Sequence, residues 1–170
     1  MTGSAVVASF AILMPEEVFA RQFLAEHLAR LEALGGPGCW FHSPTIDGLQ
    51  NGSTDATVLL TGWGTPRLTP ELLTLCPRLR LIAHCAGTVR HFVDPALFQH
   101  GVRLTTSNAA NAVPVAEFLL SWVLRWNKLL PHWEQSYKAG PDSFRQRSDA
   151  RFVSMGNRDK VIGIVGASKV

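Results

Sequence analysis

The amino-acid sequence predicts an α/β protein built on a parallel sheet with helices on both faces. Three observations lead to this fold class: short apolar runs of strand type recur along the chain, helical segments separate them, and Gly and Pro residues mark the boundaries. Hydrophobic residues make up 46% of the 170 residues and charged residues 17%, which is typical of a folded chain. The length suits one domain, or one domain and the start of another.

The first predicted strand, Val6 to Leu13, is a β-branched-rich apolar run that ends at a proline, as expected of a strand buried on both faces. A helix is predicted next. It begins at Pro15 with two glutamates, carries apolar residues at helical spacing, and stops at Gly35-Gly36. Together the two segments predict the first half of a βαβ unit.

The same alternation continues through four more predicted strands. These are Cys39 to His42, Ala56 to Leu60, Leu79 to Cys85 and Val102 to Thr106. Short helical segments are predicted from the cap at Thr69 and from Pro95. Repeated βα units of this kind favour a parallel sheet that is covered by helices on each side.

A long apolar helix is predicted over Asn111 to Leu130, with Asn111 as a possible N-cap and Pro114 just inside. Its apolar residues occupy more than one side. Such a helix is expected to be buried from more than one side, between domains or between subunits, although an ordinary core helix remains an alternative. After a polar stretch, Val161 to Val165 is predicted to be the first strand of a second domain.

Charge and cysteine content narrow the classes of function. The formal net charge is +3, and the basic stretch Ser143 to Lys160 also carries acidic residues, so it favours a solvated surface over nucleic-acid binding. Cys39, Cys76 and Cys85 are odd in number and lack metal-type spacing, which predicts neither a disulfide framework nor a zinc site. Neither a secretory signal nor a membrane span is expected, so a cytoplasmic protein without membrane partners is predicted.

Three loops after predicted strands are candidates for ligand binding, because ligands of open parallel sheets bind outside the carboxyl ends of the strands. They are Gly62-Trp63-Gly64, Ala86-Gly87-Thr88 and Gly166-Ala167-Ser168. The second loop could gather backbone N–H groups for a carboxylate or phosphate, or it could be a simple turn. The third matches the first half of the dinucleotide fingerprint G-x-G-x-x-G, with Ser168 at the second glycine. His84 and Cys85 are adjacent on a strand and are expected to point to opposite faces, with Cys85 as a small buried hydrophobe.

The order of these segments resembles the D-isomer-specific 2-hydroxyacid dehydrogenase family. In that family R-A-G-x-G-x-D-x-V-D precedes G-I-x-V-x-N-x-P-G-x-N-x-x-x-V-A-E, and the nucleotide-binding glycines follow. Matching residues in this sequence are Ala86, Gly87, Val93, Asp94, Gly101, Asn111, Val115, Ala116, Glu117, Gly163 and Gly166. Departures from the pattern are Cys85, Val89, His91, Thr106, Asn108 and Ala109.

The resemblance implies a flavodoxin-like substrate domain over residues 1–108. A crossing helix, a connecting loop and the incomplete start of a Rossmann domain that binds NAD or NADP would follow over residues 109–170. By analogy, Gly87, Thr88 and Val89 would hold the carboxylate of a 2-hydroxy or 2-oxo acid, and Trp63 would be a pocket wall. The cofactor-binding set would be Thr88, Asn111, Gly166, Ala167, Ser168 and Lys169.

The resemblance also implies a homodimer and hydride transfer between the nicotinamide and the acid. The family's catalytic Arg, Glu and His lie after the fingerprint, so they are expected beyond Val170, and residues 1–170 alone are expected to be inactive. The alternative function is a non-catalytic binding or dimerisation module, for which the departures around Gly87 and Ser168 are the motivation.

Overall fold

The computed structural model describes residues 8–52, 55–140, 142 and 155–166. The chain divides into two compact units, Met1–Asn108 and Ala109–Val170, and each is described by itself. This division falls at the position expected for the domain boundary. The assignment of the units to a substrate domain and a nucleotide-binding domain stays a prediction.

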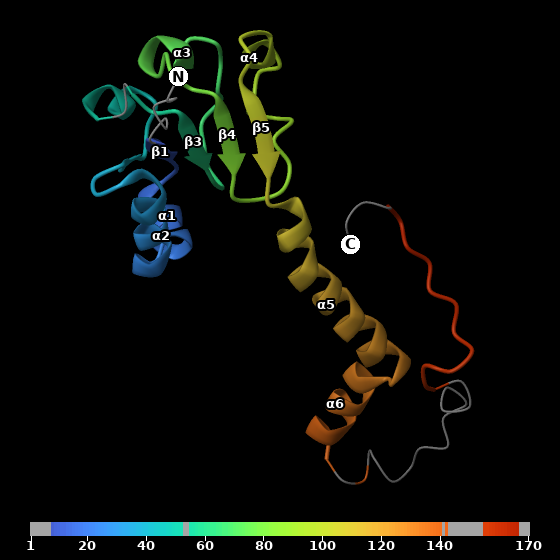
Figure 1. Cartoon of the computed structure of the whole chain (residues 1–170). Helices are drawn as coiled ribbons and strands as arrows, with labels where there is room; N and C mark the ends of the chain where they lie inside the picture. The colour runs from blue at the N-terminus through green and yellow to red at the C-terminus, as the bar shows by residue number, and fades with distance from the viewer. Residues whose placement is uncertain (1–7, 53–54, 141, 143–154, 167–170) are drawn as a thin grey trace. The chain divides into compact units, whose positions relative to one another are not determined.

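The first unit contains a five-stranded, all-parallel sheet in the order β2-β1-β3-β4-β5 (Figure 1). Its strands are β1 (Phe10–Leu13), β2 (Trp40–Ser43), β3 (Val58–Thr61), β4 (Leu81–His84) and β5 (Arg103–Thr106). Each strand overlaps a segment that the sequence predicts to be a strand, and no strand is longer than its predicted segment. The predicted fold class is therefore confirmed, and the strand order places β3 in the middle of the sheet, with β1 between β2 and β3.

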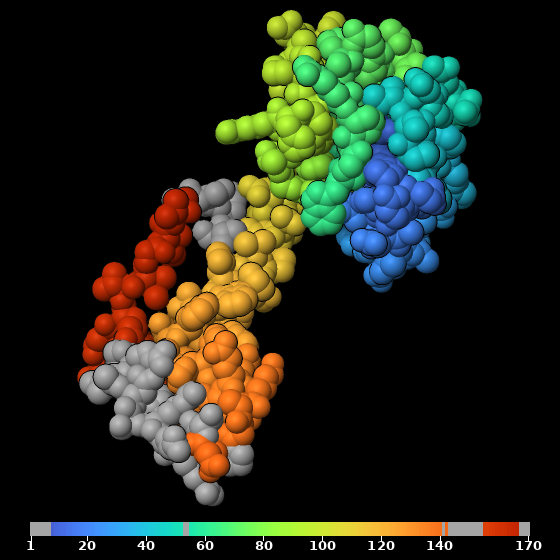
Figure 2. Space-filling model, turned by 180° about the vertical axis from the view of Figure 1, so that it is seen from behind, coloured from blue at the N-terminus to red at the C-terminus, as the bar shows by residue number. Residues whose placement is uncertain are grey.

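Helices cover both faces of this sheet. On one face lie α1 (Glu16–Gln22) and α2 (Ala25–Gly35), whose apolar side chains pack on the cluster around Ile12. On the other lie the 3₁₀ helix η1 (Asp47–Asn51), α3 (Leu72–Leu75) and α4 (Ala96–Gln99), which contribute Leu49, Leu72 and Leu97 to a second, larger cluster. The space-filling view shows the first unit as a closely packed body (Figure 2).

The alternation of side chains along β1 explains why the sheet has two apolar cores. Phe10 and Ile12 belong to the cluster beside α1 and α2, whereas Ala11 and Leu13 belong to the cluster on the opposite face. All four residues of β1 are buried. Because successive side chains of a strand point to opposite faces, a central strand covered on both sides must be apolar throughout.

The prediction of a single helix from Pro15 to Gly35 is wrong in one respect, because the structure has two helices there, α1 and α2. Leu24 has extended backbone angles (φ −74°, ψ 164°), and its N–H donates to Nδ1 of His27 over 3.1 Å. The break is compatible with good packing, since Phe19 and Phe23 before it and Leu28 after it all contact the same cluster. Tertiary contacts here override the helical periodicity.

The second unit contains α5 (Asn108–Asn127) and α6 (Leu130–Lys138). The prediction that Asn111 caps the long helix is wrong, because α5 begins three residues earlier and has Pro114 inside it. Leu129 adopts the left-handed conformation (φ 55°) between the two helices. An ion pair between Arg125 and Glu134, with a nitrogen–oxygen distance of 2.5 Å, links them.

The predicted strand Val161 to Val165 is not formed in the structure. These residues lie outside any strand, and Val161 and Val165 are exposed at 97% and 105% of their reference areas. The described part of the second unit has no strand beside which this run could pair. A strand without a hydrogen-bonded neighbour has little to stabilise it, which is the physical reason for the difference.

As for membranes, none of the helices within the described ranges combines the length and apolarity that crossing a bilayer requires.

Candidate functional site

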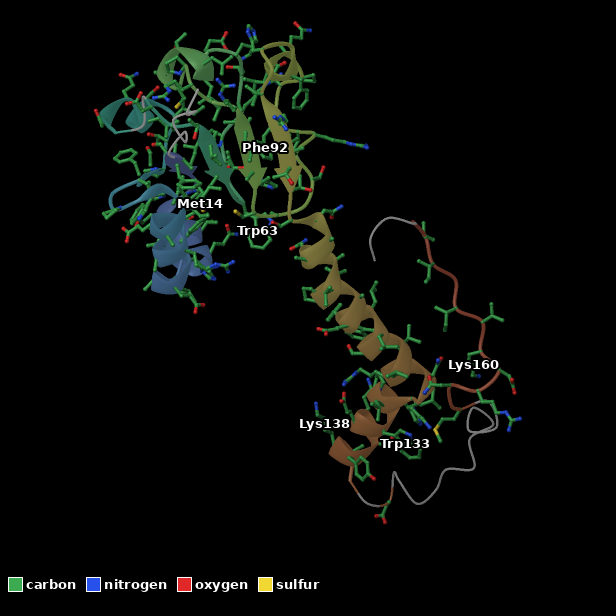
Figure 3. The ribbon with its side chains drawn as sticks, viewed as in Figure 1. Met14, Trp63, Phe92, Trp133, Lys138 and Lys160 are labelled. Carbon is green, nitrogen blue, oxygen red and sulfur yellow. The ribbon has the colours of Figure 1, made fainter. Side chains whose placement is uncertain are left out.

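The carboxyl edge of the sheet in the first unit brings two of the three candidate loops together. The strands are in register, so their final residues form a row across the sheet: Ser43, Leu13, Thr61, His84 and Thr106. The loops after β3 and β4 leave from the middle of this row. Trp63 lies at the end of the sheet to which the strand arrows point (Figures 1 and 3).

The loop after β4 carries backbone N–H groups that are free to bind a ligand. Its start is anchored, because Cys85 donates its N–H to the Thr61 carbonyl over 2.7 Å and Ala86 is buried. Its end is also anchored, since the Val89 carbonyl accepts from the N–H groups of Phe92 and Val93. Between these anchors, no described residue accepts a hydrogen bond from the N–H of Gly87, Thr88 or Val89.

The sequence predicts that these three consecutive residues bind an anion. Gly87 and Val89 are half-buried, and Thr88 is exposed. Partial burial strengthens the interaction of an N–H group with a negative charge, and a short run of unpaired amides suits a carboxylate. Gly87, Thr88 and Val89 therefore lie on one anchored loop, whereas Trp63, the fourth predicted substrate-binding residue, lies on the loop after β3, and the role of all four stays a prediction.

His84 and Thr61 form a buried polar pair directly beneath this loop. Nδ1 of His84 lies 3.0 Å from Oγ1 of Thr61, and His84 is 4% exposed. Burial lowers the pKa of His84, and the charge of nearby His91 lowers it further. His84 is therefore neutral at neutral pH. The pair ties the ends of β3 and β4 together, which fixes the point from which the loop leaves.

The loop after β3 is held by a threonine that the sequence analysis does not single out. Thr65 donates its hydroxyl toward the carbonyl of Leu13 over 3.0 Å, and it accepts the N–H of Gly62 over 3.1 Å. Gly64 adopts a φ of 77°, which favours glycine. Trp63 lies between these fixed points with 58% of its area exposed. A threonine three residues after the glycine that follows a strand is the sequence signal from which these hydrogen bonds could have been predicted.

Cys85 and His84 point to opposite faces of the sheet, as predicted. His84 lies against Phe92, with 5.0 Å between ring centroids, whereas Cys85 lines a cavity of about 440 Å³ that also contacts Phe23 and Leu60. Burial raises the pKa of the Cys85 thiol, so it is protonated and a poor nucleophile at neutral pH. The expectation that Cys85 is a small buried hydrophobe needs one correction, because the residue is only partly buried.

The remaining predicted cofactor residues belong to the second unit. Asn111 is half-buried in the first turns of α5. Gly166 has a φ of 101°, the left-handed region that a tight glycine turn uses, and a Cβ there would meet no other atom within 4 Å. Ala167, Ser168 and Lys169 lie outside the described residues.

Three solved structures are similar to this chain to different degrees. A phosphoglycerate oxidoreductase from Rhizobium etli matches with a TM-score of 0.63 and 21% identity, over 88% of this chain and 46% of that chain. A putative D-3-phosphoglycerate dehydrogenase from Ralstonia solanacearum gives a TM-score of 0.43 and 18% identity, over 77% and 39% of the two chains. The pyruvate reductase of Chlamydomonas reinhardtii gives 0.47 and 20%, over 96% and 43%.

The first of these matches shows that this chain shares its fold with part of the Rhizobium etli oxidoreductase. The chain spans less than half the length of each of the three solved chains. No family model and no curated protein matches the sequence. The match to the Rhizobium etli structure agrees, at the level of the fold, with the resemblance drawn from the sequence motifs.

Proposed function

We propose that this chain supplies the acid-binding part of an NAD- or NADP-dependent oxidoreductase that acts on a 2-hydroxy or 2-oxo acid. One observation carries the proposal: the N–H groups of Gly87, Thr88 and Val89, from which no described residue accepts a hydrogen bond, lie on an anchored loop at the carboxyl edge of a parallel sheet. This is the edge at which ligands of such sheets bind. The fold shared with the Rhizobium etli oxidoreductase and the ordered sequence motifs support the same function.

In this proposal the chain binds and orients the acid. The three N–H groups hold the carboxylate, and the exposed ring of Trp63 forms one wall beside it. The buried pair of Thr61 and His84 positions the loop and does not touch the acid. Hydrogen bonds to a charged acceptor are stronger than neutral ones, so fixed amides suffice for recognition of the carboxylate.

A nicotinamide cofactor would supply the hydride in such a reaction. Gly166 has the backbone angle that a phosphate-binding turn needs, but Val161 to Val165 form no strand to carry that turn. The described residues of the second unit thus do not by themselves build a dinucleotide site. The assignment of Thr88, Asn111 and Gly166 to the cofactor is part of the proposal.

The carboxylate site can be tested with two variants of one residue. Thr88→Pro removes the backbone N–H, whereas Thr88→Ala keeps it and removes only the hydroxyl and methyl groups. We expect Thr88→Pro to weaken oxalate binding about tenfold, as loss of a charge-assisted hydrogen bond implies, and Thr88→Ala to leave it within about twofold. Isothermal titration calorimetry measures both, with thermal midpoints as the check on folding. Equal affinities in the two variants would contradict the site.

The reaction itself is tested by following the absorbance of reduced nicotinamide with 2-oxo acids of increasing size, using the complete gene product. Oxidation of NADH or NADPH that requires the acid supports the function. If the complete product binds oxalate at the loop but oxidises neither cofactor, the proposed hydride transfer is contradicted and only acid binding is supported.

A homodimer is proposed on the apolar surface of α5, and the same observation favours the second candidate function, a non-catalytic dimerisation module. Large apolar side chains of this helix are exposed: Val113, Val115, Phe118, Leu119, Leu120, Trp122, Leu124 and Trp126. Exposed apolar patches of this kind mark association sites. A second copy would pair like surfaces around a two-fold axis, the commonest symmetry of soluble oligomers. Sedimentation of a monomer at micromolar concentration would contradict both the dimer and the second function.

A further inference from the structure

A polar cavity of about 370 Å³ lies at the amino edge of the sheet in the first unit. It is formed by the segments that lead into β3, β4 and β5, at the edge opposite the loop of Gly87 (Figure 1). Its lining consists of Thr57, Pro77, Arg78, Leu79, Arg80, His100 and Gly101. No aromatic platform and no acidic side chain is among these residues, so the cavity has a positive character.

Arg80 contributes to this cavity a charge that no described residue compensates. Within the described ranges no carboxylate forms an ion pair with Arg80, and Arg80 is exposed to solvent. Arg78 contacts Asp55 over 3.5 Å, but both side chains are more than half exposed, so water screens this pair. His100, at the end of α4, adds a ring that can donate a hydrogen bond.

The backbone around Arg80 is held on two sides. Its N–H donates to the carbonyl of Thr57 over 2.9 Å, and its carbonyl accepts the N–H of Arg103 over 2.8 Å. These bonds fix the residue between the amino ends of β3 and β5. The backbone that carries the guanidinium is thus fixed, so ligand binding has to order only the side chain.

We propose that this cavity binds a small phosphate-bearing anion. An arginine guanidinium matches the geometry of phosphate oxygens with paired N–H donors, and two arginines with a histidine suit more than one negative charge. The cavity volume lies near the lower end of the range for small-molecule sites. The concave shape and the lack of Phe, Tyr and Trp in the lining favour a small molecule over a nucleic-acid strand.

The site is independent of the proposed acid site. The two lie at opposite ends of the strands, since β4 begins after Arg80 and ends before the loop of Gly87. An anion at Arg80 therefore does not compete for the N–H groups of Gly87, Thr88 and Val89. Failure of either proposal leaves the other standing.

Calorimetric titration with inorganic pyrophosphate tests the site. We expect saturable binding at one site per chain, weakened about tenfold or more in Arg80→Gln because charged hydrogen bonds are lost. Arg21→Gln is the matched control, since it removes the same charge from the exposed end of α1 and should leave the affinity within about twofold. Thermal midpoints verify that both variants fold, and an oxalate titration at the Gly87 loop should be unchanged in both.

Three results would overturn the proposal. The first is the absence of saturable pyrophosphate binding to the unmodified chain. The second is an equal loss in Arg80→Gln and Arg21→Gln, which would indicate attraction to overall charge. The third is tighter binding of a mixed-sequence oligonucleotide than of pyrophosphate, with the oligonucleotide binding lost in Arg80→Gln. The surface would then bind a nucleic-acid partner.

Discussion

Two apolar runs of similar composition have opposite environments in this chain. Phe10–Leu13 forms β1, in which every residue is buried. Val161 to Val165 forms no strand, and its apolar side chains are exposed, Ile162 at 47% and Ile164 at 77%. Local sequence alone does not distinguish the two runs, since both are rich in residues that favour strands.

The difference between the two runs lies in what surrounds them. Strand β1 pairs with β2 on one side and with β3 on the other, and apolar clusters cover both of its faces. The later run has no described strand beside it. Strand formation in a parallel sheet thus depends on neighbouring strands that are distant in sequence. Apolar patterning identifies only the segments that are able to pair with such neighbours.

The largest effect is expected from matched isoleucine truncations in the two runs. Ile12→Ala removes methyl and methylene groups from a fully buried site and should lower the free energy of unfolding by about 2–5 kcal/mol. Ile164→Ala, at an exposed site, should change it by less than about 0.5 kcal/mol. Urea unfolding monitored by circular dichroism measures both. Similar losses in the two variants would show that the later run is buried in solution.

A smaller effect is expected at the polar pair that supports the candidate loop. Thr61→Val removes the hydroxyl beside His84 and leaves a buried ring nitrogen without its partner, at a cost of about 1–3 kcal/mol. Thr105→Val makes the same change at an exposed position of β5 and serves as the control. Equal unfolding free energies for the two variants would mean that the Thr61 bond contributes nothing.

The pH dependence of stability sharpens the role of His84. Burial lowers the pKa of His84 in the folded chain below the ordinary value of 6.5, so below that value the unfolded chain binds more protons at this group. The free energy of unfolding contributed by His84 should therefore fall as the pH falls from 6.5 toward the lowered pKa. Denaturation curves across this range should show the loss, and His84→Gln should reduce it. If the free energy of unfolding of His84→Gln depended on pH as steeply as that of the unmodified chain, another group would be responsible for the pH dependence.

The sequence predicts the repeated βα pattern well because apolar periodicity is a local property. The candidate loop at Gly87 was predicted for the same reason, since a glycine directly after an apolar strand is visible in the sequence. The break at Leu24 was missed because it depends on packing against a shared cluster and on the side chain of His27. The cavity around Arg80 was also missed, since it combines Thr57, Arg78 and His100 from separate segments that only the sheet brings together.

The contrast between the two edges of the sheet leads to the most direct test of the proposed function. Backbone amide chemical shifts would be followed by nuclear magnetic resonance during titration of the chain with oxalate. The account predicts saturable shifts at Gly87, Thr88 and Val89, whose N–H groups are free among the described residues, and little change at Gly36, which precedes β2 and does not line the Arg80 cavity. Shifts absent from the loop, or equally large at Gly36, would contradict the assignment of a carboxylate site to the carboxyl edge.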